Sequence, residues 1–218
     1  MEYPKAIKQT AWRLFSENGI KNTSIEMICK ELQIAKKTFY KYFDNKKELI
    51  RSIVHDNFSV FQDLFNTSMI EQLSPITTFL RFIQQLRRMT HGEYSSNEQD
   101  TKFFYPMYPN IMIELPLLYP HIWEEIDQFR HSLLERIAYL LENEKEDFIK
   151  ETIHVKVISR ILFAMIETVI HPLFLQQNNI SFDQAFHSAM TILFTGIIKE
   201  EKQTEIMGRI YTSGEAQD

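Results

Sequence analysis

The sequence predicts an all-α fold in which a small three-helix domain precedes a larger helical domain. Apolar residues recur at spacings of three and four along most of the chain, which is the period of an amphipathic helix. Only five glycines occur among 218 residues, which leaves few positions for hairpins. Ser, Asn and Pro also precede several of the apolar runs, as expected where helices begin.

The first helix is predicted over residues 4–18 and ends at Asn18-Gly19, because glycine tolerates the left-handed conformation found at helix C-termini. Thr23 is expected to cap the second helix, with Glu26 completing a capping box. The turn Gln33-Ile34 follows. The spacing of the apolar residues predicts that the three-helix core closes on itself.

The third helix is short and is predicted to bury Phe39 and Phe43, which lie four residues apart. Its polar side chains then point outward, and they are Lys36, Lys37, Thr38, Tyr40 and Lys41, followed by Tyr42. Short helices packed at an angle, with lysines and tyrosines on one exposed face, suit insertion into the major groove of DNA.

The distribution of charge agrees with this interpretation. Residues 1–50 contain ten Lys or Arg and six Asp or Glu, whereas the whole chain has a net charge of −5. A basic head on an acidic body is typical of a phosphate-binding domain fused to a domain that does not bind DNA. A solvated basic face is the alternative if charge is considered alone.

Residues 7–50 resemble the N-terminal DNA-binding domain of TetR-family (TetR/AcrR) transcriptional regulators. The matching positions include Gly19, Thr23-Ser24-Ile25, Thr38-Phe39-Tyr40, Tyr42-Phe43 and Glu48-Leu49. The resemblance implies a helix-turn-helix domain at residues 1–48 and a helical ligand-binding and dimerisation domain at residues 49–204. Residues 205–218 are expected to form a frayed polar tail.

The resemblance also implies which residues contact DNA, through base edges at the start of the third helix and through phosphates elsewhere. This set is Thr23, Ser24, Lys36, Lys37, Thr38, Tyr40, Lys41, Tyr42 and Lys46. Packing of Tyr42 against the first helix is an alternative. Gln33 replaces the usual turn glycine, so we expect a positive φ there, and Ala35 cannot cap the third helix with its side chain.

The body contains further predicted helices at about 45–65, 75–89, 123–141, 151–175 and 182–198, with Ser74 and Ser181 as caps. Residues 91–99 are expected to form a loop, and the prolines of residues 101–118 permit only a broken helix. The last two long helices are apolar on more than one face. In the family such helices form a homodimer interface, and a dimer would place two recognition helices on successive major grooves of a near-palindromic operator.

Family members usually bind a small effector in the body, and aromatic, Met and polar side chains around the kinked segment are the candidates here. They are Phe104, Tyr108, Met112, Trp123, Phe163, Glu167 and His171. An apolar pocket with a few polar groups has this lining. Ordinary core packing is the alternative, and a surface pair or a core histidine explains Glu167 and His171 better than a metal site.

Other classes of function find less support in the sequence. No segment reaches the length of a membrane span, no signal peptide is recognisable, and Cys29 is the single cysteine, so we expect a cytoplasmic protein. We expect no catalytic residues, metal or cofactor, and the effector is not identified. The resemblance implies a ligand-responsive regulator, most often a repressor. A helical interaction module without operator binding and an enzyme with an appended head remain as alternatives.

Overall fold

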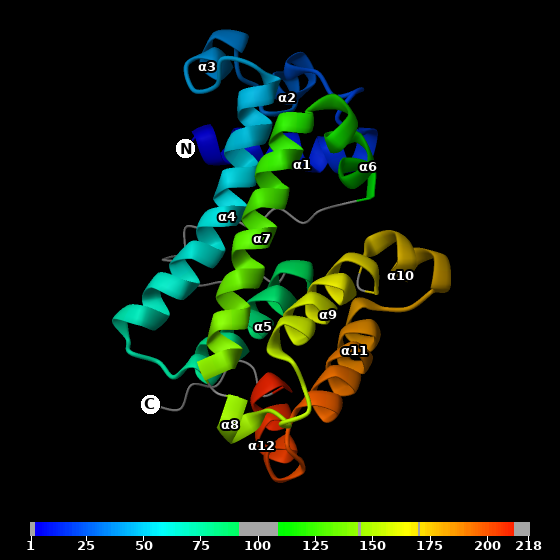
Figure 1. Cartoon of the computed structure of the whole chain (residues 1–218). Coiled ribbons are helices and arrows are strands. Elements are labelled where there is room, and N and C mark those ends of the chain that lie inside the picture. The colour runs from blue at the N-terminus through cyan, green and yellow to red at the C-terminus, as the bar shows by residue number, and fades with distance from the viewer. Residues whose placement is uncertain (1–2, 92–108, 144, 170, 212–218) are drawn as a thin grey trace. The chain divides into compact units, whose positions relative to one another are not determined.

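The computed structural model describes residues 3–91, 109–143, 145–169 and 171–211 (Figure 1). These residues form helices and no strand beyond a single antiparallel bridge between Ile149 and Ile198, so the all-α prediction is confirmed. The helices are α1 (Tyr3–Asn18), α2 (Ile25–Glu31), α3 (Lys36–Tyr40), α4 (Lys46–Ile70), α5 (Pro75–His91), α6 (Pro109–Leu118), α7 (Pro120–Asn143), α8 (Lys145–Phe148), α9 (Val155–Thr168), α10 (Pro172–Asn178), α11 (Phe182–Ile197) and α12 (Glu200–Tyr211).

The chain divides into two compact units, and the division differs from the predicted boundary at residue 48. The described residues of 3–60 and 109–129 form the first unit, here called the head. Those of 61–91 and 130–211 form the second unit, here called the body. Helices α4 and α7 each contribute residues to both units. The head therefore includes α6 and the beginning of α7, which the sequence pattern had assigned to the body.

The core of the head is built from both parts of this unit. Phe15, Ile28 and Phe39 from α1, α2 and α3 are fully buried in one cluster with Ile111 and Leu115 from α6. Ile122 and Ile126 from α7 belong to the same cluster. The expectation that three helices close the core by themselves is therefore wrong, because α6 and α7 supply part of its buried apolar surface.

Polar contacts from α6 hold the turn between α1 and α2. The side-chain amide of Asn110 donates to the carbonyl of Ser16 at 2.9 Å, and the carboxylate of Glu114 accepts the backbone N–H of Lys21 at 2.8 Å. Gly19 has φ +83°, and the Glu114 carboxyl group lies against the position that a Cβ would occupy there. The glycine is thus required both by its backbone conformation and by the close approach of α6.

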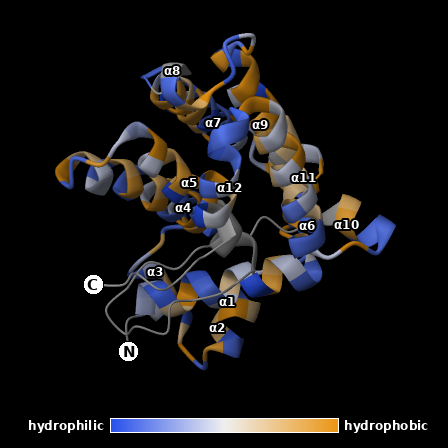
Figure 2. Cartoon of the chain, turned by 90° about the horizontal axis from the view of Figure 1, so that it is seen from below, coloured by the Kyte–Doolittle hydropathy of each residue, from blue (hydrophilic) through white to orange (hydrophobic). Residues whose placement is uncertain are grey.

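The body has an aromatic core. The rings of Phe61 and Phe82 lie 5.6 Å apart, and those of Phe79 and Phe194 lie 6.0 Å apart, which joins α4, α5 and α11. Helices α9 and α11 also contact each other, and both carry apolar stretches, drawn orange in Figure 2. The predicted cap Ser181 is confirmed, since its hydroxyl accepts the N–H of Gln184 in a complete capping box.

Two predictions for the body are wrong. The helix expected over residues 151–175 is two helices, because α9 begins after His154 and ends at Thr168, and α10 begins at Pro172, whose ring cannot continue a preceding helix. The tail expected from residue 205 is helical as far as Tyr211, since Ile206 is fully buried and anchors α12. The predicted loop at 91–99 begins with a helical residue, His91, and its remainder lies outside the described residues.

Substitution of Gly19 by alanine is expected to destabilise the protein by at least about 1–2 kcal/mol, because a left-handed alanine is strained and its methyl group displaces Glu114. Gly208→Ala is the matched control, since a methyl group at this helical position meets no atom within 4 Å. This control should stabilise the chain by about 0.5–1 kcal/mol. Urea unfolding followed by circular dichroism measures both, and equal effects would contradict the assigned role of Gly19.

Candidate nucleic-acid interface

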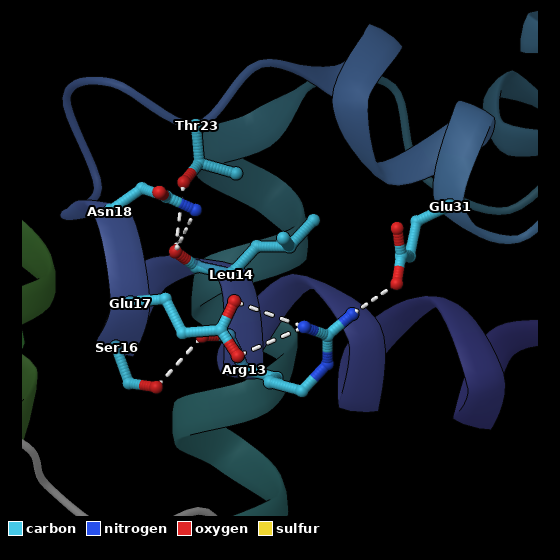
Figure 3. Close-up of polar contacts among 7 residues, drawn as sticks. All are labelled: Arg13, Leu14, Ser16, Glu17, Asn18, Thr23 and Glu31. Carbon is cyan, nitrogen blue, oxygen red and sulfur yellow. Dashed lines mark hydrogen bonds and ion pairs between the residues drawn. The ribbon is translucent and has the colours of Figure 1, made fainter.

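The N-terminus of α2 is capped by Ser24, and the capping box predicted for Thr23 is wrong. The Ser24 hydroxyl accepts the N–H of Met27 at 3.2 Å. Thr23 is fully buried, and its hydroxyl donates to the carbonyl of Leu14 at 3.1 Å (Figure 3) and to that of Gly19 at 2.8 Å. Contact of the Thr23 side chain with a phosphate, which the resemblance implied, is therefore excluded in this conformation, whereas Ser24 is exposed.

The turn between α2 and α3 has the strained geometry that its sequence predicts. Gln33 adopts φ +54°, and the N–H of Ile34 donates to the carbonyl of Cys29 at 2.9 Å. Ala35 precedes α3 in an extended conformation and makes no side-chain cap. Both expected departures from good local geometry are confirmed. The turn is held instead by burial on its inner side, where Ile34 packs against the head core.

Helix α3 separates an apolar side from a basic side. Phe39 is fully buried, and its ring lies 5.8 Å from that of Phe43. Lys36 and Lys37 are exposed, Tyr40 is half exposed, and Thr38 is half-buried. Lysine ammonium groups on such a helix can donate to guanine O6 and N7 or to phosphate oxygens, so the surface has the chemistry of a recognition helix.

Lys36 has an intramolecular partner that the sequence pattern did not identify. Its ammonium lies 3.2 Å from the carboxylate of Glu26, which stands in the first turn of α2. The available signal was a pair of opposite charges on either side of the helix-turn-helix turn. The sequence pattern alone favours a capping box for Glu26, which the structure does not contain.

Tyr42 and Lys41 lie just beyond α3. The Tyr42 ring stacks on Tyr3 of α1 with 6.2 Å between centroids, and the Lys41 ammonium lies 5.9 Å from the centre of the Tyr42 ring. Packing of Tyr42 on α1, the alternative raised by the sequence, is therefore present. Lys41 itself is exposed.

Lys46, at the start of α4, is half-buried and its ammonium contacts the backbone of the head. Its ammonium donates to the carbonyls of Ile20 at 2.7 Å and Thr23 at 2.8 Å. Burial lowers the pKa of this lysine, and the nearby Glu114 carboxylate opposes the shift. The ammonium thus joins α4 to the turn between α1 and α2, and the phosphate contact of Lys46 stays a prediction.

The candidate effector residues are distributed over different parts of the chain. Phe104 and Tyr108 lie outside the described residues. Met112 and Trp123 belong to the head, where Trp123 packs against the core. Phe163 is buried in the body, Glu167 lies in α9, and His171 lies between α9 and α10. Neither unit contains the whole set, so the effector pocket stays a prediction.

The described residues offer neither a metal-binding cluster nor a membrane-spanning helix. They contain no group of three or more His, Cys, Asp or Glu side chains that could hold a metal ion. No helix among them is long and apolar enough to cross a membrane.

Replacement of Lys46 by alanine should destabilise the protein by about 1–3 kcal/mol, because two partly buried carbonyls lose their donor. The neighbouring Lys47 is exposed, and Lys47→Ala should change the free energy of unfolding by less than about 0.5 kcal/mol. Chemical denaturation of both variants checks the difference. Equal stability of the two would show that the Lys46 ammonium does not hold the turn.

The N-terminal segment matches a known family. Residues 7–53 match the profile of the bacterial regulatory proteins, tetR family. Over 54 residues the chain is 41% identical to the HTH-type transcriptional regulator YuxN from Bacillus subtilis (strain 168). This match covers 25% of the chain and 19% of YuxN, so the chain spans about a fifth of the length of that relative.

Solved structures share the fold over most of the chain. One is SmeT, the repressor of the Stenotrophomonas maltophilia multidrug efflux pump SmeDEF, with a TM-score of 0.65 at 18% identity. The match covers 99% of this chain and 96% of the SmeT chain. Another is FadR from Bacillus subtilis in complex with stearoyl-CoA, with a TM-score of 0.60 at 16% identity. That match covers 88% of this chain and 98% of the FadR chain. At these identities the likeness shows the fold alone. The profile match assigns residues 7–53 alone to the helix-turn-helix domain of the bacterial regulatory proteins, tetR family.

Proposed function

We propose that this protein is a homodimeric transcriptional regulator that binds a near-palindromic operator and responds to a small molecule. The observation that carries the proposal is the basic outer face of α3 within a matched helix-turn-helix domain. Two such helices, held about one helical turn of DNA apart, would read successive major grooves.

The DNA contacts follow from exposure and chemistry. Lys36, Lys37, Thr38 and Tyr40 would meet base edges and neighbouring phosphates in the major groove. Ser24 and Lys41 would position the domain on the backbone, and the polar tip of Tyr42 would support them while its ring stacks on α1. Thr23 and Lys46 would stabilise the head from within.

An exposed apolar stripe on the body supports the proposed dimer. On α9, Val157 and Ile161 are exposed one turn apart, and the small Ala164 follows on the same side. On α11, Ile192 is 74% exposed and lies between Ser188 and Gly196, which are also exposed. Small residues beside apolar side chains allow close approach of a second copy, which would bury this stripe.

Repression and effector binding rest on the likeness to regulators of the same fold. SmeT is a repressor, and FadR is in complex with stearoyl-CoA, so this fold serves repression and accommodates a small ligand. We propose the same arrangement here, with release from the operator when the effector binds. The protein would act in the cytoplasm, where the DNA is.

Alanine at Lys36, Lys37 and Tyr40 should weaken operator binding strongly without unfolding the head, because all three side chains are exposed. A palindromic site is first selected from a random duplex library with the wild-type protein, and binding is then followed by fluorescence anisotropy. The affinity should fall at least about ten-fold, since each good base contact contributes roughly 1–3 kcal/mol.

Lys21→Ala/Lys30→Ala provides the control, because it removes two exposed lysines of the head that lie outside α3. Wild-type affinity should also fall steeply as salt rises, because neutralised phosphates release counterions. An affinity insensitive to salt, or equal losses in both variants, would favour the alternative of a helical interaction module without operator binding.

A charge placed in the apolar stripe should separate the dimer. Ile192→Asp is expected to sediment as a monomer at concentrations where the wild type is dimeric, because the carboxylate would be desolvated at the interface. Leu117→Asp is the matched control, since Leu117 on α6 is 77% exposed and lies outside the stripe. Analytical ultracentrifugation distinguishes them, and a dimeric Ile192→Asp variant would place the interface elsewhere.

A further inference from the structure

We propose that Glu26 is a specificity-determining residue that limits binding to non-cognate DNA by occupying Lys36. The inference rests on the proposed operator binding, and it deepens that proposal by assigning a role to an acidic side chain on the DNA-facing side of the head. Nothing in the likeness to other regulators assigns this role.

The contact crosses the helix-turn-helix turn. The carboxylate Oε2 of Glu26 lies 3.2 Å from the Nζ of Lys36, so the first turn of α2 is joined to the first turn of α3. Both side chains remain accessible, with 72% of Glu26 and 54% of Lys36 exposed. The Lys36 ammonium is therefore open to an approaching phosphate, with the Glu26 carboxylate beside it.

The two charges act in opposite senses on a DNA backbone. Binding to non-cognate DNA comes almost entirely from attraction between basic side chains and phosphates. A phosphate that engages Lys36 competes with Glu26 for the ammonium, and the Glu26 carboxylate then lies close to the negative backbone. Both effects weaken backbone binding.

At a cognate site the same pair can be satisfied by bases. Lysine donates to O6 and N7 of guanine, and a carboxylate accepts from N4 of cytosine. A G·C pair facing the start of α3 thus offers a partner to each charge, whereas a phosphate offers a partner only to Lys36. Glu26 consequently raises the ratio of operator affinity to non-specific affinity.

The chain offers a matched control on the same helix. Glu31 also lies in α2 and is 53% exposed, but its carboxylate pairs with Arg13 of α1 at 2.6 Å (Figure 3). Glu31→Gln removes the same charge from the same domain and leaves Lys36 paired. It therefore reports the general effect of one charge on DNA binding.

The test measures the affinity of the full chain for a random-sequence duplex in Glu26→Gln, Glu31→Gln, Lys36→Ala and the Glu26→Gln/Lys36→Ala double variant. Glu26→Gln should tighten this binding by about two- to five-fold per head, the range expected when an exposed ion pair is released. Glu31→Gln should tighten it less. When Lys36 is already alanine, Glu26→Gln should not tighten binding to the random duplex comparably. In the otherwise wild-type protein, Glu26→Gln should increase the affinity for the selected operator less than the affinity for the random duplex.

Three results would overturn the inference while leaving operator binding intact. They are an equal gain from Glu31→Gln, an equal gain from Glu26→Gln with Lys36 absent, and a loss of affinity in Glu26→Gln. Failure of the wild-type protein to bind any duplex would instead refute the proposed function, so the two failures are distinguishable. Because Glu26 and Lys36 are exposed, unfolding curves should be unchanged and confirm that each variant is folded.

Discussion

The burial of α6 and the start of α7 in one core with residues of α1, α2 and α3 is the interaction on which the helix-turn-helix surface depends. A helix-turn-helix segment of about fifty residues, taken alone, buries little apolar surface and would be only marginally stable. Ile111 and Leu115 supply the missing area from the middle of the chain, while Asn110 and Glu114 hold the turn that leads into α2. The position of α3 is therefore set in part by residues that lie outside the helix-turn-helix segment.

Charge in the head is distributed less simply than the excess of basic residues indicates. Lys46 donates to two carbonyls inside the domain, and Lys36 has a carboxylate partner beside it. Lys37 and Lys41 are the more open basic groups at the recognition surface. A count of lysines therefore overstates the positive charge that the head presents to solvent.

Local signals predicted much of the fold. The left-handed Gln33, the uncapped α3, and the starts of α5 after Ser74 and α11 after Ser181 all follow from residues within one or two helical turns. Contacts between distant segments could not be predicted in this way. Ser24 caps α2 because Thr23 is drawn inward by carbonyls of α1 and of the turn after it, and Lys46 turns inward for a similar reason. The candidate effector residues depend wholly on such long-range packing, and part of that set lies outside the described residues.

The position of Cys29 has a chemical consequence for the head. This thiol is 3% exposed within the head core, and burial raises its pKa. Oxidants and alkylating reagents attack the thiolate, which is scarce when the pKa is raised and is shielded here by α2 and its neighbours. While the head is closed, the single sulfhydryl of the chain is thus protected, and its rate of modification reports how often the helices that carry the recognition surface separate.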